Sequence, residues 1–338
     1  MRASAWVAGQ RPVRVVIVGA GGWGQQHARV FASRPDVDLR AVAARHADRA
    51  DARAAEWGIR AYTSVPEMID AESPDLVSVC LPNEAHFDAT MQVIEAGVPL
   101  LAEKPLAFDL GQADQMIAAA AERNLFFAIN FNHRYAEPAR RAKAAISAGD
   151  LGDVVFASWR FGGEPGTSRD PDANLIETQC HGLDMLEYLC GPICSVMAQM
   201  TSRAGLGHPT VAVSLAFASG AVGTLLGSYE TSYAYPGTHL LEVSGTRGRL
   251  LIEDTVKRFT LSRAGEETRQ VWEAGYFNDD GRDFHHTFDA YADALLAALK
   301  AGAPPPVHAR AGRRALEVAR ALIASFESGQ RVDVAGPR

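Results

Sequence analysis

The sequence lacks any long hydrophobic run. Its apolar stretches fall well short of the roughly 18 consecutive residues that a membrane-spanning helix needs. The opening segment, Met1 to Pro12, also lacks the apolar core of a secretory signal peptide. We therefore expect no membrane partner and no export, and we predict a cytoplasmic protein.

Excess positive charge is absent as well. The chain has 33 Lys and Arg against 40 Asp and Glu, which gives a net charge of −7. Proteins that bind nucleic acid usually carry a basic patch or a strongly basic domain. We therefore expect no nucleic-acid partner.

Cysteine is scarce, with four residues in 338. Cys80, Cys180, Cys190 and Cys194 form no C-x-x-C pair and no spacing typical of zinc ligands. Cys180 next to His181 could be a metal or nucleophile pair, but neighbours in sequence rarely face one another. We expect reduced thiols and no metal site.

What is present is a regular alternation in the first third of the chain. Short apolar segments separated by helix-like segments predict a parallel sheet covered on both faces, which is a doubly wound α/β fold. The expected strands are Val13–Val18, Leu39–Ala43, Asp75–Leu81, Val98–Ala102 and Phe126–Ile129. The expected helices are Trp23–Ala32, Ala47–Trp57, Asn83–Ala96 and Leu110–Glu122.

The pattern changes after a further helix at Pro138–Ala148. Turn signals such as Ser219-Gly220 and Thr246-Arg247-Gly248 then join six strand-like segments. These expected strands are Val154–Phe161, Val211–Ala218, Ala221–Ser228, His239–Ser244, Arg249–Ile252 and Val256–Ser262. They predict a second, α+β domain with a largely antiparallel open sheet, which two late helices at Asp283–Ala301 and Ala311–Ser325 complete. The predicted domains are 1–131 and 132–338, with a cleft between them.

The first strand runs into a glycine-rich loop, Gly19-Ala20-Gly21-Gly22-Trp23-Gly24. The spacing is G-x-G-x-x-G between a strand and a helix, which is the context of a dinucleotide-binding Rossmann domain. Gly19 permits the tight turn, Gly21 lets the backbone approach a pyrophosphate, and Gly24 lets the helix pack on the strand. Free N–H groups at the start of the helix favour phosphate.

The second strand lacks the acidic residue that usually binds the ribose 2′-hydroxyl of NAD. It ends in Ala43-Ala44-Arg45-His46. Ala44 removes a carboxylate that would repel a 2′-phosphate, and Arg45 could pair with that phosphate. The cofactor is thus NADP or NAD, with NADP favoured, unless Arg45 only stacks on adenine or faces solvent.

A lysine follows the fourth expected strand, in Glu103-Lys104-Pro105-Leu106. The carboxyl end of a parallel strand borders the crevice where such sheets bind ligands. With the glycine loop, this motif and three others resemble the Gfo/Idh/MocA oxidoreductase family. The other three are Leu81-Pro82-Asn83-Glu84-Ala85-His86, Asn130-Phe131-Asn132-His133-Arg134-Tyr135 and Glu177-x-x-x-His181-x-x-Asp184.

The resemblance covers nearly the whole chain and implies hydride transfer between a nicotinamide and a hydroxyl carbon of a sugar, cyclitol or derivative. It also implies a homodimer or homotetramer that associates through the second-domain sheet. The motifs assign cofactor binding to Gly19, Ala20, Gly21, Trp23, Gly24, Arg45, His46, Leu81, Pro82, Asn83, His86, Glu103 and Lys104. Substrate binding is assigned to Lys104, Asn132, Arg134, Trp159, Glu177, His181 and Asp184.

Elementary chemistry supports the catalytic assignment of Lys104, His181 and Glu177. Oxidation of an alcohol needs a base, and a histidine pKa near 6.5 suits that task. Lys104 can stabilise a developing alkoxide, and Glu103 could anchor Lys104 or the nicotinamide ribose. Spacing of i, i+4 and i+7 predicts that Glu177, His181 and Asp184 share one helix face.

Other interpretations stay open. The helix with His181 could be an ordinary amphipathic helix with an interior histidine. Asp184 could support a substrate-binding residue without contacting the substrate itself. A nicotinamide-recycling lyase or hydrolase, or a non-catalytic dinucleotide sensor, would use the same fold. We interpret His27, His285 and His286 as helix-surface or packing residues.

Overall fold

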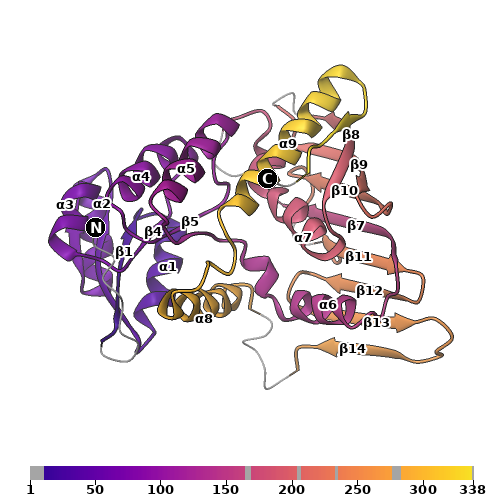
Figure 1. Cartoon of the computed structure of the whole chain (residues 1–338), viewed down its shortest axis with the longest axis horizontal. Coiled ribbons are helices and arrows are strands. Elements are labelled where there is room, and N and C mark those ends of the chain that lie inside the picture. The colour runs from indigo at the N-terminus through magenta and orange to yellow at the C-terminus, as the bar shows by residue number, and fades with distance from the viewer. Residues whose placement is uncertain (1–10, 164–168, 204–206, 233–234, 276–282, 337–338) are drawn as a thin grey trace. The chain divides into compact units, whose positions relative to one another are not determined.

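The computed structural model describes residues 11–163, 169–203, 207–232, 235–275 and 283–336, and the chain forms two compact units (Figure 1). Unit 1 comprises Met1–Asn130 and Phe288–Arg313. Unit 2 comprises Phe131–Thr287 and Arg314–Arg338. Each unit has its own sheet, so each is described by itself.

Six strands of the described chain form the sheet of unit 1, in the order β3-β2-β1-β4-β5-β6. All neighbouring pairs are parallel. The strands are β1 Val13–Val18, β2 Val37–Ala43, β3 Arg60–Tyr62, β4 Leu76–Val79, β5 Leu100–Ala102 and β6 Phe127–Ile129. The strand order reverses between β1 and β4, which creates the switch point where such sheets bind ligands.

Helices alternate with these strands, and all but α3 were expected from the sequence pattern. They are α1 Gly22–Ala32, α2 Ala47–Trp57, α3 Val65–Glu72, α4 Asn83–Glu95 and α5 Leu110–Glu122. The strands β1, β4, β5 and β6 are buried almost throughout, because helices cover both faces of a doubly wound sheet. The predicted doubly wound domain is confirmed.

The chain returns to unit 1 near its end, which the sequence did not indicate. Helix α8 (His286–Ala301) falls largely within the segment Phe288–Arg313, although sequence reasoning placed that segment in the second domain. The Tyr291 hydroxyl donates a hydrogen bond of 2.7 Å to the carbonyl oxygen of Ile129 in β6. Phe288 stacks on Trp23 with ring centroids 5.6 Å apart. These contacts are long-range in sequence, so local patterns do not reveal them.

Unit 2 is built on a wide sheet of nine described strands, in the order β14-β13-β12-β11-β7-β10-β9-β8-β15. The pair β7 and β10 is parallel, and the other neighbouring pairs are antiparallel. The prediction of a largely antiparallel sheet is confirmed. The strands are β7 Val154–Gly162, β8 Ile193–Thr201, β9 Thr210–Phe217, β10 Val222–Ser228, β11 His239–Gly245, β12 Gly248–Glu253, β13 Arg258–Arg263, β14 Arg269–Glu273 and β15 Val332–Asp333.

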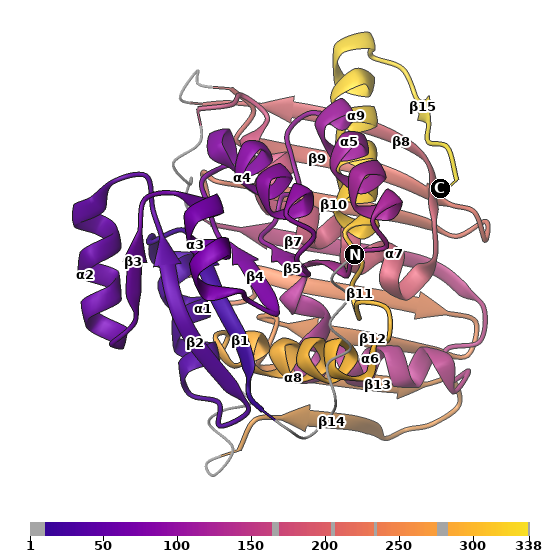
Figure 2. The same cartoon turned by 60° about the vertical axis from the view of Figure 1, so that its left-hand side comes forward.

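Helices lie on one face of this sheet (Figure 2). They are α6 Glu137–Ser147, α7 Cys180–Cys190 and α9 Arg310–Ser328, with short turns η1 Asn132–Tyr135 and η2 Asn174–Thr178. Helix α6 contacts β12 and β13, α7 contacts β7, and Ser325 of α9 accepts a hydrogen bond from the backbone of β8. Within the described ranges, no helix is long and apolar enough to cross a membrane.

Candidate active site

The glycine loop follows β1 and has the backbone that its spacing predicts. Gly19 has φ of +123°, and a Cβ atom there would overlap the carbonyl oxygen of Cys80. A Cβ atom on Gly24 would overlap the carbonyl oxygen of Gly19. The first and last glycines therefore permit the turn and the close approach of α1, because any side chain would displace the backbone.

Gly21 and Gly22, in the middle of the loop, border open space. A Cβ atom on either would meet no heavy atom within 4 Å. The first turn of α1 has no acidic residue and no side-chain cap. Backbone N–H groups at such a helix start attract phosphate oxygens. The loop therefore fits the pyrophosphate of a dinucleotide, which Gly21 and Gly22 would hold.

The segment after β2 is basic, with no acidic residue at positions 44–46. Arg45 and His46 are both exposed, and the Arg45 Nε lies 3.4 Å from the His46 Nε2. Helix α2 also reaches the glycine loop, because Arg53 donates a hydrogen bond of 3.2 Å to the carbonyl oxygen of Ala20. This edge of the loop thus presents positive charge.

Lys104 follows β5 and lies near the glycine loop. Its Nζ atom is 5.9 Å from the centroid of the Trp23 ring, and Trp23 belongs to the first turn of α1. The Lys104–Pro105 peptide is cis. The Glu103 carboxylate accepts a hydrogen bond of 3.2 Å from the backbone N–H of Lys104. Glu103 is buried and points inward, so its observed contacts anchor Lys104.

The segment after β4 lies at the same end of the sheet. Leu81 is half-buried and Pro82 is exposed, and α4 begins at Asn83, whose side chain lies outside the described residues. His86 is buried, and its Nδ1 lies 3.2 Å from the carbonyl oxygen of Leu106. Burial lowers the pKa of His86. A neutral His86 therefore supports the turn that follows Lys104.

His27, interpreted from sequence as a helix-surface or packing residue, is a buried packing residue of α1. His27 is 3% exposed, and its Nε2 lies 2.8 Å from Oε1 of Glu103. It stands three residues after Gly24 and four before Phe31, both of which are buried in α1. This spacing in the sequence indicated that His27 lies on the buried face of α1, because residues three and four apart on a helix share a face.

The predicted helix face shared by Glu177, His181 and Asp184 is wrong for Glu177, whereas His181 and Asp184 both lie in α7. Glu177 lies in η2, a π-helical turn, whereas α7 begins at Cys180. The backbone N–H of Gln179 donates to the carbonyl oxygen of Asn174, five residues earlier. A π turn contains an extra residue, so α-helical spacing does not relate Glu177 to His181.

Gln179, which sequence reasoning missed, fixes this turn. The side chain is fully buried; it accepts a hydrogen bond of 3.1 Å from the Trp159 indole and donates one of 3.1 Å to Asn174 Oδ1. A Cβ atom on Gly182 would overlap the Trp159 ring, so α7 packs closely on β7. Trp159 was expected to bind substrate, but its observed contacts hold α7 in place. No local signal marked Gln179, because Glu177, Thr178 and His181 beside it are polar as well.

His181 lies on α7 and is stacked on His133 of η1. The ring centroids are 4.0 Å apart and the planes differ by 11°. The two side chains are 6% and 2% exposed. Phe131 contacts His181 edge-on at 5.9 Å. The imidazole that we assign as base is therefore held between rings and keeps one orientation.

Arg134 and Asp184, both expected to bind substrate, bind each other. Arg134 donates hydrogen bonds of 2.8 and 2.5 Å to the two carboxylate oxygens of Asp184. Burial alone would lower the pKa of Arg134, but the Asp184 carboxylate outweighs burial and raises it. Asn132 likewise has a protein partner, since it donates a hydrogen bond of 2.7 Å to Thr287. The Arg134–Asp184 pair joins η1 to α7, and the Asn132 bond joins η1 to the first turn of α8.

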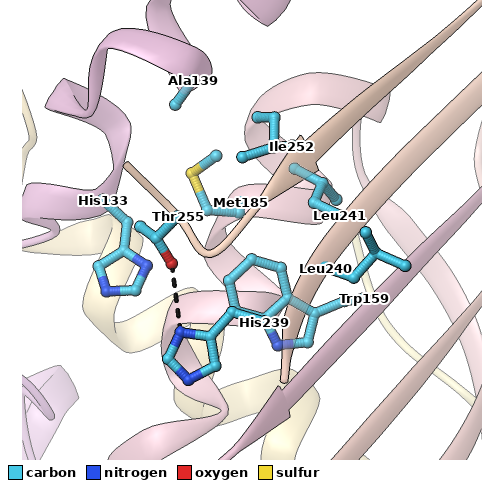
Figure 3. A pocket seen from close by; sticks show the side chains of 9 residues that line it. All are labelled: His133, Ala139, Trp159, Met185, His239, Leu240, Leu241, Ile252 and Thr255. Atoms are coloured by element: carbon cyan, nitrogen blue, oxygen red, sulfur yellow. Dashed lines mark hydrogen bonds between the residues drawn. The ribbon is translucent and has the colours of Figure 1, made fainter. Parts of the chain in front are cut away.

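A small cavity in unit 2 separates His133 from β11 (Figure 3). Trp159 and Thr255 also line it, and His239 lies 3.5 Å from the Thr255 hydroxyl. Its volume of about 10 Å³ admits at most one water molecule. The cavity is therefore a packing gap and too small for a sugar.

No cluster of three or more His, Cys, Asp or Glu suited to a metal ion occurs in the part of the chain that the structure describes. The four cysteines are thiols, and three of them are buried. Burial raises the pKa of Cys190 to about 12, which makes that thiol unreactive.

Comparison with known proteins agrees with both units. A model of the Gfo/Idh/MocA oxidoreductase family, described as an NAD-binding Rossmann fold, matches residues 13–131. The model of the family's C-terminal alpha/beta domain matches residues 143–334. Together the two matches account for most of the chain.

Individual relatives carry related names. Myo-inositol 2-dehydrogenase of Thermotoga maritima is 26% identical over an alignment that covers 95% of this chain and 98% of that protein. D-glucoside 3-dehydrogenase of Escherichia coli is 32% identical over 191 residues, 53% of this chain and only 54% of that relative's length. Levoglucosan dehydrogenase, solved with NADH and levoglucosan, has the same fold, with a TM-score of 0.86 at 20% identity over 96% of this chain and all of that one. The chain belongs to the Gfo/Idh/MocA family and is an NAD-binding oxidoreductase.

Proposed function

We propose that this protein is a dehydrogenase that acts on a hydroxyl carbon of a sugar, a cyclitol or a derivative of one. The position of Lys104 carries the proposal. Its ammonium group lies 5.9 Å from the ring of Trp23, beside the loop that fits a pyrophosphate. The names of the myo-inositol, glucoside and levoglucosan dehydrogenases support the same class of substrate.

The chain's own residues supply binding and proton transfer. A bound nicotinamide supplies the site that accepts or donates hydride. Lys104 donates a hydrogen bond to the substrate oxygen and stabilises negative charge on it. The imidazole of His181 takes the hydroxyl proton and returns it in the reverse direction. Glu177, in the adjoining π turn, holds a substrate hydroxyl or orients His181.

We further propose that the enzyme prefers NADP to NAD. Ala44 offers no carboxylate at the end of β2, and the exposed side chain of Arg45 can pair with a 2′-phosphate. The Arg45→Ala variant should then raise KM for NADP and leave KM for NAD unchanged. A lower KM for NAD than for NADP in the wild type would contradict the preference.

The sheet of unit 2 supports a homodimer or homotetramer. Val155, Phe156, Met197, Val222 and Leu226 are exposed apolar residues of β7, β8 and β10. Apolar surface of this kind favours association between subunits. Light scattering should report a dimer or tetramer for the wild type and smaller species for Phe156→Glu. We also infer that the enzyme works in the cytoplasm, which the four cysteine thiols support.

A cofactor-coupled screen of sugars, sugar acids, amino sugars and inositols tests the central proposal. Lys104→Met and His181→Ala should each lower kcat by about 10²- to 10⁴-fold, while dinucleotide still binds. Lys257→Met replaces an exposed lysine of unit 2 and serves as the matched control. Product formation without net reduced cofactor would favour a recycling lyase. Dinucleotide binding without turnover of any substrate would favour a sensor.

A further inference from the structure

A buried hydrogen-bonded cluster lies directly behind Lys104 in unit 1. At its centre is the Glu103 carboxylate, with Oε1 2.8 Å from His27 Nε2 and 2.5 Å from Asn130 Nδ2. The other oxygen, Oε2, accepts the backbone N–H of Lys104 at 3.2 Å. His27 Nδ1 lies 2.7 Å from the Ser78 hydroxyl. Both carboxylate oxygens therefore have donors from the protein itself.

The cluster joins four separate elements of the sheet unit. His27 comes from α1, Ser78 from β4, Glu103 from the end of β5 and Asn130 from the end of β6. Each of these side chains is at most 5% exposed. Helix α1 also carries the glycine loop at its start. His27 therefore links α1 to the end of β5, directly before Lys104.

The charges in this cluster are complementary. Burial alone would lower the pKa of His27, but the neighbouring Cys80 and Glu103 outweigh burial and raise it to about 10. Burial alone would raise the pKa of Glu103, but His27, Lys104 and Asn130 together lower it. An imidazolium at His27 thus faces a carboxylate at Glu103 throughout the neutral pH range. Removal of either charge leaves the other buried, which is costly.

Aromatic rings close the cluster on the side of α8. Phe288 contacts His27 edge-on at 5.7 Å and stacks on Trp23 at 5.6 Å. The Lys104 ammonium lies 5.9 Å from that same Trp23 ring. Lys104 is therefore constrained at its backbone through Glu103 and lies near Trp23 at its tip. Both constraints depend on residues of α1, because His27 contacts Glu103 and Trp23 lies near the Lys104 ammonium group.

We propose that His27 is a positioning residue that sets the place of Lys104 by holding the Glu103 carboxylate. His27 does not touch the substrate; it fixes the carboxylate that fixes the Lys104 backbone. This inference rests on the proposed role of Lys104 in catalysis. Displacement of a catalytic group by about 1 Å can cost up to about 100-fold in rate, so a residue of this kind affects kcat.

The test compares His27→Gln with Tyr62→Phe. Tyr62 donates a hydrogen bond of 2.7 Å to Glu72, a buried carboxylate elsewhere in unit 1, so Tyr62→Phe controls for the structural cost of such a loss. His27→Gln should lower kcat by about 10- to 100-fold and change KM for the dinucleotide by less than about threefold. Tyr62→Phe should leave kcat unchanged. Equal kcat values for the two variants at equal Tm would overturn the proposal.

A double-mutant cycle asks whether His27 acts through Lys104. If it does, adding His27→Gln to Lys104→Met lowers kcat no further, because the group that His27 positions is already gone. If the fold-losses in kcat of the two single variants multiply in the double variant, His27 acts independently of Lys104. Full turnover by Lys104→Met alone would instead contradict the proposed function, so the two failures are distinguishable.

A measurement without turnover completes the test. The chain has four lysines, Lys104, Lys143, Lys257 and Lys300, so reductive methylation with carbon-13 gives few side-chain signals. The Trp23 ring current makes the Lys104 signal sensitive to position. In the ligand-free protein, His27→Gln should shift the Lys104 signal, and Tyr62→Phe should not. An unmoved Lys104 signal in His27→Gln would show that His27 does not set its place.

Discussion

The two units each bury a carboxylate beside a residue that we assign to catalysis, but they neutralise it differently. In unit 1, Glu103 faces His27 at 2.8 Å. In unit 2, Asp184 receives both arms of the Arg134 guanidinium. Arginine keeps its charge at every accessible pH, whereas histidine does not. Unit 2 therefore has a cation of fixed charge, whereas the charge of the cation in unit 1 depends on pH.

The largest expected effect comes from breaking the arginine pair. Arg134→Met leaves Asp184 buried at 5% exposure without its cation. Loss of one partner from such a pair should lower the free energy of unfolding by about 3–5 kcal/mol. Urea denaturation measures this change. Arg134→Lys should lose less stability than Arg134→Met, because lysine keeps the charge although it cannot donate two parallel hydrogen bonds. A loss below about 1 kcal/mol for Arg134→Met would show that water screens the pair.

The histidine pair should cost less to break. In His27→Phe, Glu103 keeps two donors, the Asn130 amide and the Lys104 backbone. We expect a loss of about 2–3 kcal/mol, the range for a hydrogen bond to a charged group. The same urea titration gives the value. A loss as large as that of Arg134→Met would mean that the remaining donors contribute nothing.

Stability in unit 1 should also depend on pH in a way that unit 2 does not. The pKa of His27 is raised from 6.5 to about 10, so its protonation stabilises the fold fully below pH 6.5. That contribution declines as pH rises and is lost above about pH 10. The difference in stability between wild type and His27→Gln should therefore narrow from pH 6.5 to 10. The corresponding difference for Arg134→Met should not narrow over this range, because burial raises the pKa of Asp184 and the variant leaves that carboxylate without its cation. A parallel decline would contradict the comparison.

The smallest effect is expected at Ser78. Ser78→Ala removes the hydroxyl that lies 2.7 Å from His27 Nδ1 but leaves the pair with Glu103 intact. The loss should be about 1.5 kcal/mol, the low end for one hydrogen bond to a charged group, because the ion pair with Glu103 remains. Thermal unfolding of the variant beside His27→Phe tests the order. A larger loss for Ser78→Ala would make the serine, not Glu103, the main partner of His27.

The parts of the fold that the sequence predicted depend on local patterns. Strand β1 and helices α2 and α5 begin and end at the residues expected from apolar runs and helix periodicity. Strand β3 (Arg60–Tyr62) and strand β14 (Arg269–Glu273) were missed because they are short or mostly exposed. Strand β8 was missed because Cys, Ser, Ala, Gln and Met interrupt its β-branched residues.

The candidate site also has features that local sequence patterns predict and features that they do not. The glycine loop and Lys104 follow from sequence because each is a short motif at the end of a strand. Three features do not follow, since none has a local signature: the π turn before His181, the stacking of His133 on His181, and the pair of Arg134 with Asp184. Each depends on contacts between residues that helix periodicity alone does not bring together.

The central claim is that Lys104 serves hydride transfer beside a dinucleotide loop. Stopped-flow reduction of bound NAD or NADP by a substrate found in the screen measures that step directly. Lys104→Met should bind the dinucleotide with the wild-type Kd and reduce it more slowly by about 10²-fold or more. Wild-type reduction rates in Lys104→Met, with Kd unchanged, would contradict the account.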